Sequence, residues 1–170
     1  MKNLISSIFL HPFIVGLVCC LPLLGGCQKN QIGDDSNTIP LSEIPENPAF
    51  ASLPLIGTKW KLIGFVDRTT NKVKSVQSSE IDNYTLVFES NGDFAGISST
   101  NTIMGGVSFD VSDGLMKVEK LGGTKINETP YGNQYMSLLR STIEYEITEK
   151  GLKLLNESTI YLLYSPIETF

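Results

Sequence analysis

From Gly57 onward, apolar and polar residues alternate with a period of two over short stretches of the chain. In the first stretch, Trp60 and Leu62 alternate with Lys59 and Lys61. The same alternation returns at residues 84–88, 107–111, 116–119 and 143–147. Pairs such as Asn-Gly and Asp-Gly separate the stretches, and this arrangement is typical of antiparallel strands with one buried face. The pattern therefore predicts an antiparallel, mostly β domain.

One segment departs from this period. Thr129-Pro130 has the residue types of a helix N-cap and a first helical position. After it, Tyr135, Leu138 and Leu139 recur at helical spacing. We therefore predict one short helix near residues 130–141.

The last apolar run, residues 159–164, has apolar side chains on both sides of the expected strand, so we predict that this strand is buried on both faces. Taken together, the patterns predict a single α+β domain over residues 55–170. Its fold class is mostly β, an antiparallel β-barrel-like or highly twisted sheet of about eight strands with one short helix.

The beginning of the chain predicts export and lipidation. A positive start at Lys2 and an apolar stretch from Leu4 precede Leu24-Gly25-Gly26-Cys27, which is a lipobox. Prolines interrupt the apolar stretch, whereas a permanent membrane span needs about 20 apolar residues in a row. We therefore expect residues 1–26 to be a lipoprotein signal peptide and Cys27 to carry diacylglycerol in the bacterial envelope.

Residues 27–54 combine the lipidation site with a polar, proline-rich stretch that lacks periodicity. Such composition buries little apolar surface, so the sequence predicts a flexible tether between the membrane and the domain. Gln28 follows the lipidated cysteine where aspartate would favour the inner membrane. We therefore expect an outer-membrane protein facing the periplasm or the cell surface.

Composition excludes several kinds of chemistry. The chain has 18 acidic and 13 basic residues and a net charge of -5, so no nucleic-acid partner is expected. Its one histidine, His11, lies in the signal peptide, as do Cys19 and Cys20. Because histidine and a free thiol are missing after cleavage, we expect no catalytic triad, no zinc or other metal site, and no cofactor.

The part of the chain from residue 57 to residue 167 resembles the META domain family of small bacterial proteins, which includes HslJ-like lipoproteins. The resembling positions are Trp60, Leu62, Phe88, Gly92, Gly96, Asn101, Gly105, Gly106, residues 121–125, Tyr135, Leu138, Leu139, Tyr145, Ile147, Leu152 and Leu154. The resemblance implies a non-catalytic envelope protein that supports stress tolerance through contacts with another protein. Thr100 stands where family members often have a cysteine, and Asn127 stands near where a second cysteine often follows, so no disulfide or redox role is carried over.

For such a protein, the glycine-rich segments are the candidate binding loops. The candidate residues are Asn101, Thr102, Met104, Gly105, Gly106, Gly122, Gly123, Thr124 and Lys125. Glycine permits close approach to a backbone, and loops on a rigid sheet often carry binding residues. The alternative is that these glycines only form turns.

Two further functions remain open. A small-molecule or lipid carrier would enclose an apolar ligand between Trp60, Phe88, Phe109 and Tyr145, although a single tryptophan can equally be part of the core. A carboxylate-dependent hydrolase of envelope glycans would use Glu144 and Glu146, which are about 7 Å apart on one strand face. A solvated strand face is the alternative explanation for that pair.

The aspartate-rich turn at Asp110 and Asp113, with Asp82 or Asp93 nearby in the sequence, is the other candidate for a ligand set. It lacks the closing glutamate of a calcium-binding loop. We interpret it as an ordinary Asp-Ser-Gly turn.

Overall fold

The structure is a computed structural model that describes residues 37–76, 83–110 and 112–167. Its described part contains ten strands and one α-helix, and every strand pairing is antiparallel. The strands are β1 (Thr38–Pro40), β2 (Lys59–Asp67), β3 (Lys72–Ser75), β4 (Thr85–Phe88), β5 (Asp93–Ile97), β6 (Thr102–Asp110), β7 (Leu115–Gly123), β8 (Glu144–Thr148), β9 (Gly151–Leu155) and β10 (Ile160–Pro166). The predicted mostly β class with one short helix is confirmed.

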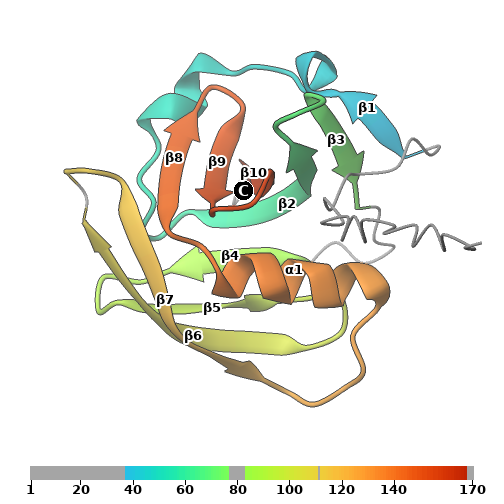
Figure 1. The fold of residues 1–170 in the computed structure, drawn as a ribbon. Helices are drawn as coiled ribbons and strands as arrows, with labels where there is room; N and C mark the ends of the chain where they lie inside the picture. Colours follow the sequence, from blue (N-terminus) through green and yellow to red (C-terminus); the bar gives the residue numbers. More distant parts are fainter. Residues whose placement is uncertain (1–36, 77–82, 111, 168–170) are drawn as a thin grey trace, which may run out of the picture.

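Eight of the strands form a closed ring of pairings. The sheet order runs β1-β3-β2-β10-β9-β8-β7-β6-β5-β4, and an additional pairing joins β2 to β4. This is possible because β2 is long: its first residues pair with β4 and its last residues pair with β3. β3 and β1 therefore extend outward from the ring, beside its upper strands in Figure 1.

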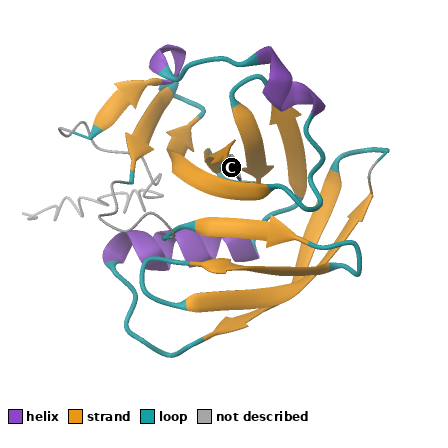
Figure 2. Ribbon diagram, turned by 180° about the vertical axis from the view of Figure 1, so that it is seen from behind, coloured by secondary structure: helices purple, strands orange, loops and turns teal. Residues whose placement is uncertain are grey.

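The helix α1 (Pro130–Arg140) begins where the sequence predicts. The Thr129 side chain accepts a hydrogen bond from the Gly132 amide at 3.0 Å, as an N-cap residue does. In both views the helix lies between two groups of strands (Figures 1 and 2). The upper group includes β2, β8, β9 and β10, and the lower group consists of β4, β5, β6 and β7. Its Tyr135 and Leu139 are fully buried in the main core.

The main core fills the inside of the ring. Its largest fully buried side chains come from both groups of strands and from α1: Trp60, Phe65, Leu86, Phe88, Phe94, Ile103, Tyr135, Leu139, Leu152, Leu154, Leu162 and Tyr164. Trp60, Leu86 and Phe88 among them are apolar positions of the period-two pattern. One face of the ring strands therefore packs in the main core, and the opposite face is available for other contacts.

A second core covers the outer face of β2, β3 and β10. Val66, Val73, Tyr161 and Leu163 are buried there together with Ile44. The last strand is therefore buried on both faces, as its sequence predicts.

Ile44 belongs to the N-terminal segment, residues 38–53, which the sequence analysis assigns to the tether. In the structure this segment forms β1 and two 3-10 helices, η1 (Leu41–Glu43) and η2 (Pro48–Ser52). β1 pairs with β3, and the Asn47 amide donates to the Glu149 carbonyl at 2.8 Å. The tether prediction therefore does not hold for these residues. Prolines at the start or end of such short elements are compatible with order, which composition alone did not reveal.

The predicted signal peptide, Cys27 and Asp82 lie outside the described residues. Within the described ranges, no helix combines the length and the apolar character needed to cross a membrane.

Candidate functional site

The two glycine-rich segments that the sequence predicts as binding loops lie side by side, because they are neighbouring strands. In the pairing of β6 with β7, Ile103 lies opposite Gly123, and Met104 lies opposite Gly122. The loop assignment is therefore wrong for Thr102, Met104, Gly105, Gly106, Gly122 and Gly123, which are in strands. The adjacent glycines at 105–106 and at 122–123 hid the period-two pattern of these strands.

The outer face of these strands is open to solvent. Met104 is 59% exposed, and Thr102 is exposed beside it on β6. An open groove of about 730 Å³ runs over β5, β6 and β7, and its lining includes Asp93, Met104 and Gly106. We call it the β5–β7 groove. It contains three of the predicted binding residues: Met104, Gly105 and Gly106.

Next to this face, a polar cluster joins the turn after β5 to the start of α1. The carboxylate of Glu128 accepts hydrogen bonds from the hydroxyls of Ser98 and Ser99, from the Thr100 hydroxyl at 3.3 Å, and from the Asn101 amide at 2.7 Å. Burial alone would raise the pKa of Glu128, but these side-chain hydrogen bonds outweigh it and lower the pKa below the ordinary value. The carboxylate is therefore held in its ionised form. We call these five residues the Glu128 cluster.

Asn101 is a structural residue rather than an exposed contact. It is only 4% exposed, and its side-chain oxygen accepts from the Thr124 hydroxyl at 2.7 Å and from the Ile126 amide at 2.8 Å. Its side-chain amide also donates to the Ile126 carbonyl at 2.8 Å. Asn101 thus fixes the path of residues 124–126, whereas Lys125 between them is exposed.

Sequence analysis did not identify Glu128 as a functional residue. The signal was present, because Ser98-Ser99-Thr100-Asn101 supplies a run of hydroxyl and amide donors, and Glu128 precedes the helix N-cap. An acidic residue at this place is also favoured by the positive end of the helix dipole. These donors and Glu128 are some 30 residues apart along the chain, and the sequence does not show that the fold brings them together.

A second open pocket, of about 570 Å³, lies beside the Glu128 cluster. One side of it is formed by Met136 and Arg140 of α1, and the other includes Asn101 and Ile126. Ile126 is 61% exposed. Exposed apolar side chains therefore occur on two neighbouring surfaces, at Met104 and at Ile126.

The four predicted cavity residues all belong to the main core or pack against it. Trp60 and Phe88 are fully buried, while Phe109 and Tyr145 are half-buried against the same cluster. The Trp60 indole donates to the Leu55 carbonyl at 3.3 Å, and the Phe88 ring lies 6.0 Å from that of Phe94. Their observed contacts are those of core residues.

Inside the same core, Tyr135 and Tyr164 bury their hydroxyls completely, and this burial raises the pKa of both phenols. The ring of Tyr84 meets that of Tyr135 edge to face, with centroids 5.3 Å apart. These tyrosines connect α1 to the strands around it, and both phenols are neutral at physiological pH.

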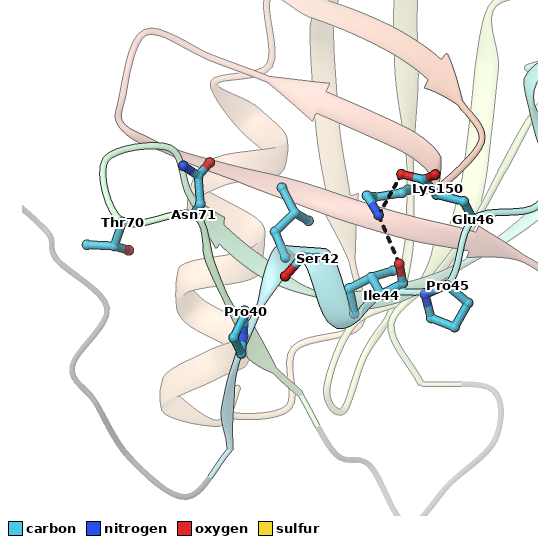
Figure 3. A pocket seen from close by; sticks show the side chains of 9 residues that line it. Pro40, Ser42, Ile44, Pro45, Glu46, Thr70, Asn71 and Lys150 are labelled. Atoms are coloured by element: carbon cyan, nitrogen blue, oxygen red, sulfur yellow. Dashed lines mark hydrogen bonds and ion pairs between the residues drawn. The ribbon is translucent and has the colours of Figure 1, made fainter.

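A third pocket, of about 650 Å³, lies between the N-terminal segment and the β2–β3 turn. Figure 3 shows Lys150 extending from the β8–β9 turn towards this segment. Its ammonium donates to the Ile44 carbonyl and pairs with Glu46, both at 2.9 Å. The lysine therefore anchors the segment, and its charge is already matched by a carboxylate.

The carboxylates that sequence analysis considered lie on the surface. Glu144 and Glu146 are both exposed on β8, and Glu146 pairs with Lys153 at 2.8 Å. Asp110 accepts hydrogen bonds from the Ser112 hydroxyl at 2.7 Å and from its amide at 2.9 Å, which lower the pKa of Asp110. Among the described residues, no three histidine, cysteine or acidic side chains are grouped so that they could hold a metal ion.

Comparison with known proteins identifies likeness in structure. No family model matches the chain, and no curated protein matches it. A protein from Burkholderia xenovorans solved by NMR is similar, with 21% identity and a TM-score of 0.54 over 85% of this chain and 98% of that one. A DUF4847 family protein from Bacteroides vulgatus, solved by crystallography, is 19% identical in sequence. Its TM-score is 0.49 over 71% of this chain and 96% of that one. The Burkholderia protein shares the fold, and at this identity the likeness extends no further.

Proposed function

We propose that the protein is a non-catalytic envelope lipoprotein of the META, HslJ-like kind, which acts by binding another protein. The observation that carries this proposal is the meeting of the two predicted binding segments on one exposed face. Thr102 and Met104 of β6 lie beside Gly122 of β7, with the exposed Lys125 just beyond. Two open pockets adjoin this face. The face therefore offers a partner apolar contacts and a concave shape, which a flat, fully polar strand face would not.

Two structural features support the resemblance to the META family. The Thr100 hydroxyl donates to the Asn127 carbonyl at 3.2 Å, so the position at which family members often have a cysteine contacts the segment near which a second cysteine often follows. The closed ring of eight antiparallel strands also supports a barrel-like domain.

A lipid on Cys27 would hold this domain close to the membrane. Because the N-terminal segment packs on the sheet from Thr38 onward, only residues 28–36 separate Cys27 from Asn37. Fully extended, that length spans about 35 Å. In this proposal the start of the folded domain therefore stays within that distance of the bilayer, and the partner is an envelope protein.

A crosslinking pull-down from the native envelope tests the proposal. Replacing Thr102, Met104 and Lys125 together with alanine should abolish partner capture, because all three side chains are exposed on the proposed face. The melting temperature should change by only a few degrees, since exposed substitutions usually alter stability by less than about 0.5 kcal/mol each. A control variant replaces Thr70 in the β2–β3 turn and Lys153 on β9, which lie away from this face, and it should capture the partner normally.

If the stable triple variant captures the partner as well as the wild type does, the binding face is wrong. A small apolar ligand that copurifies with the protein in native mass spectrometry would then favour the carrier function.

A further inference from the structure

The β5–β7 groove has a regular arrangement of side chains because β6 lies between two paired strands. In one row across the sheet, Asp93 of β5, Gly106 of β6 and Lys120 of β7 lie opposite one another. In the next row, Ala95, Met104 and Gly122 lie opposite one another. Met104 therefore has small neighbours on both sides and, along its own strand, Gly106 two residues away.

This arrangement leaves an apolar side chain standing above a surface with few neighbours. Met104 is 59% exposed, although strand positions that face water are usually polar. Methionine is flexible and polarizable and adapts to the shape of a partner. Ala95 and Gly106 leave room on either side of it for the side chains of a bound segment.

Gly106 lies at a register shift in the pairing of β6 with β7, where glycine is common, but neither its backbone angles nor its surroundings require a glycine. A Cβ atom at this position would find its nearest neighbour, the Gly92 carbonyl oxygen, at 4.0 Å, and the residue is not among those with positive φ. Gly105 differs, because a Cβ there would lie 2.6 Å from the ring of Phe94. Glycine weakens a strand relative to a larger residue, and at position 106 it also leaves the groove open beside Met104.

The charges of the groove specify the kind of partner. Glu89, Asp93 and Glu119 line it together with one cation, Lys120. Lys117, just outside the groove, pairs with Glu119 at 2.9 Å and lowers the pKa of Glu119, so the charge of this carboxylate is already matched by a lysine. Glu89 and Asp93 then outnumber Lys120, so the groove has a net negative charge beside an apolar centre, which complements a segment that carries cations on aliphatic stems.

We propose that the β5–β7 groove binds an extended, lysine- or arginine-bearing segment of a protein partner. The inference rests on the proposed protein-binding function and names its site and the chemistry of its partner. The aliphatic stems of the basic residues pack against Met104 and over Gly106, and their charged ends reach Glu89 and Asp93.

The test uses the full-length chain in detergent and a short fluorescein-labelled peptide that alternates lysine with valine. A counterpart peptide has glutamate in place of lysine. Fluorescence anisotropy should show binding of the lysine peptide, weakened by added salt, and no binding of the glutamate peptide. Equal binding of both peptides, or of neither, overturns the inference.

Two substitutions locate the binding. Glu89→Lys should weaken the lysine peptide about fivefold, as expected for reversal of one exposed charge. Glu157→Lys makes the same change in net charge in the exposed connection between β9 and β10. It should change the affinity by less than about twofold. If both variants weaken binding equally, the attraction comes from the charge of the whole molecule and the groove assignment is overturned.

Gly106→Thr tests the shape of the groove. It should leave the melting temperature unchanged or higher, because there is room for the side chain, and should weaken the peptide about tenfold. Unchanged affinity in this stable variant overturns the inference.

If Glu89→Lys and Gly106→Thr keep the native crosslinked partner while the Thr102, Met104 and Lys125 variant loses it, this inference fails and the proposed function stands. If the wild-type protein captures no partner, the proposed function itself fails.

Discussion

At the scale of single residues, the ionised carboxylate of Glu128 organises the region beside the candidate site. It gathers side-chain donors from the turn after β5 and lies directly before the N-cap Thr129. Asn101 extends the same network to residues 124–126. The exposed residues Lys125 and Ile126 therefore keep their positions through buried neighbours. Variants of the Glu128 cluster should alter binding indirectly, through the position of this segment.

Glu128→Gln should lower stability at neutral pH, because hydrogen bonds to a charged group contribute about 1.5–3 kcal/mol and the amide accepts them less well. The folded-state pKa of Glu128 lies below its unfolded value. The contribution of the carboxylate is therefore fully present above the unfolded pKa, about 4.3, and is lost as pH falls through the lower folded pKa. Urea denaturation should show a clear deficit for the variant at pH 7 and a much smaller one near pH 3. An equal deficit at both values would contradict this account of the cluster.

Cys27 carries the prediction of envelope location. Cys27→Ser should prevent incorporation of a radioactive fatty acid and leave an unprocessed or soluble protein, since the sulfur is the proposed attachment atom. Detergent phase partitioning of the processed variant provides the second measurement. Continued partitioning into the detergent phase after signal removal would show that the lipobox interpretation is wrong.

At the scale of elements, local signals in the sequence were sufficient where one short motif determines the structure. Thr129-Pro130 located the start of α1, because the cap bond to Gly132 depends on residues within one turn. The β6–β7 pair was harder to predict, since Gly105 and Gly106 interrupt the apolar pattern and the pairing depends on distant residues. The glycine content still marked these two segments as special, because glycine-rich strands and glycine-rich loops have the same composition. They differ in whether their backbone pairs with a neighbouring strand, and the sequence does not show this.

The two kinds of glycine in this region should respond oppositely to substitution. Gly105→Ala should destabilise the fold by about 1–3 kcal/mol or more, because its Cβ would meet the Lys120 carbonyl and the Phe94 ring. Gly122→Ala has open space around its Cβ and should be neutral or stabilising by up to about 1 kcal/mol. Urea denaturation of both variants measures this difference. Equal stability of the two would mean that β6 does not pack on Phe94 as described.

At the scale of the whole molecule, the fold has two apolar layers rather than one. The ring encloses the main core, and the N-terminal segment covers the outer face of β2, β3 and β10. The apolar character of residues 160–164 on both sides predicted that something covers them, but it did not say what does. The covering segment is short and rich in proline, so its composition matches that of a linker. Only its contacts with Val66, Tyr161 and Leu163 distinguish it from one.

This second layer predicts that the N-terminal segment is part of the folding unit. A chain that begins at residue 54 should unfold at a lower temperature than one that begins at residue 37, and it should bind the apolar dye ANS, because Val66, Tyr161 and Leu163 lose their cover. Ile44→Ala in the longer chain isolates the apolar contribution and should lower stability by about 2–4 kcal/mol, as other buried isoleucines do. Lys150→Met keeps the aliphatic stem but removes the bonds to Ile44 and Glu46, so it isolates the polar anchor. If both chains melt at the same temperature without binding dye, residues 38–53 are a tether after all, and the domain can stand farther from the membrane than about 35 Å.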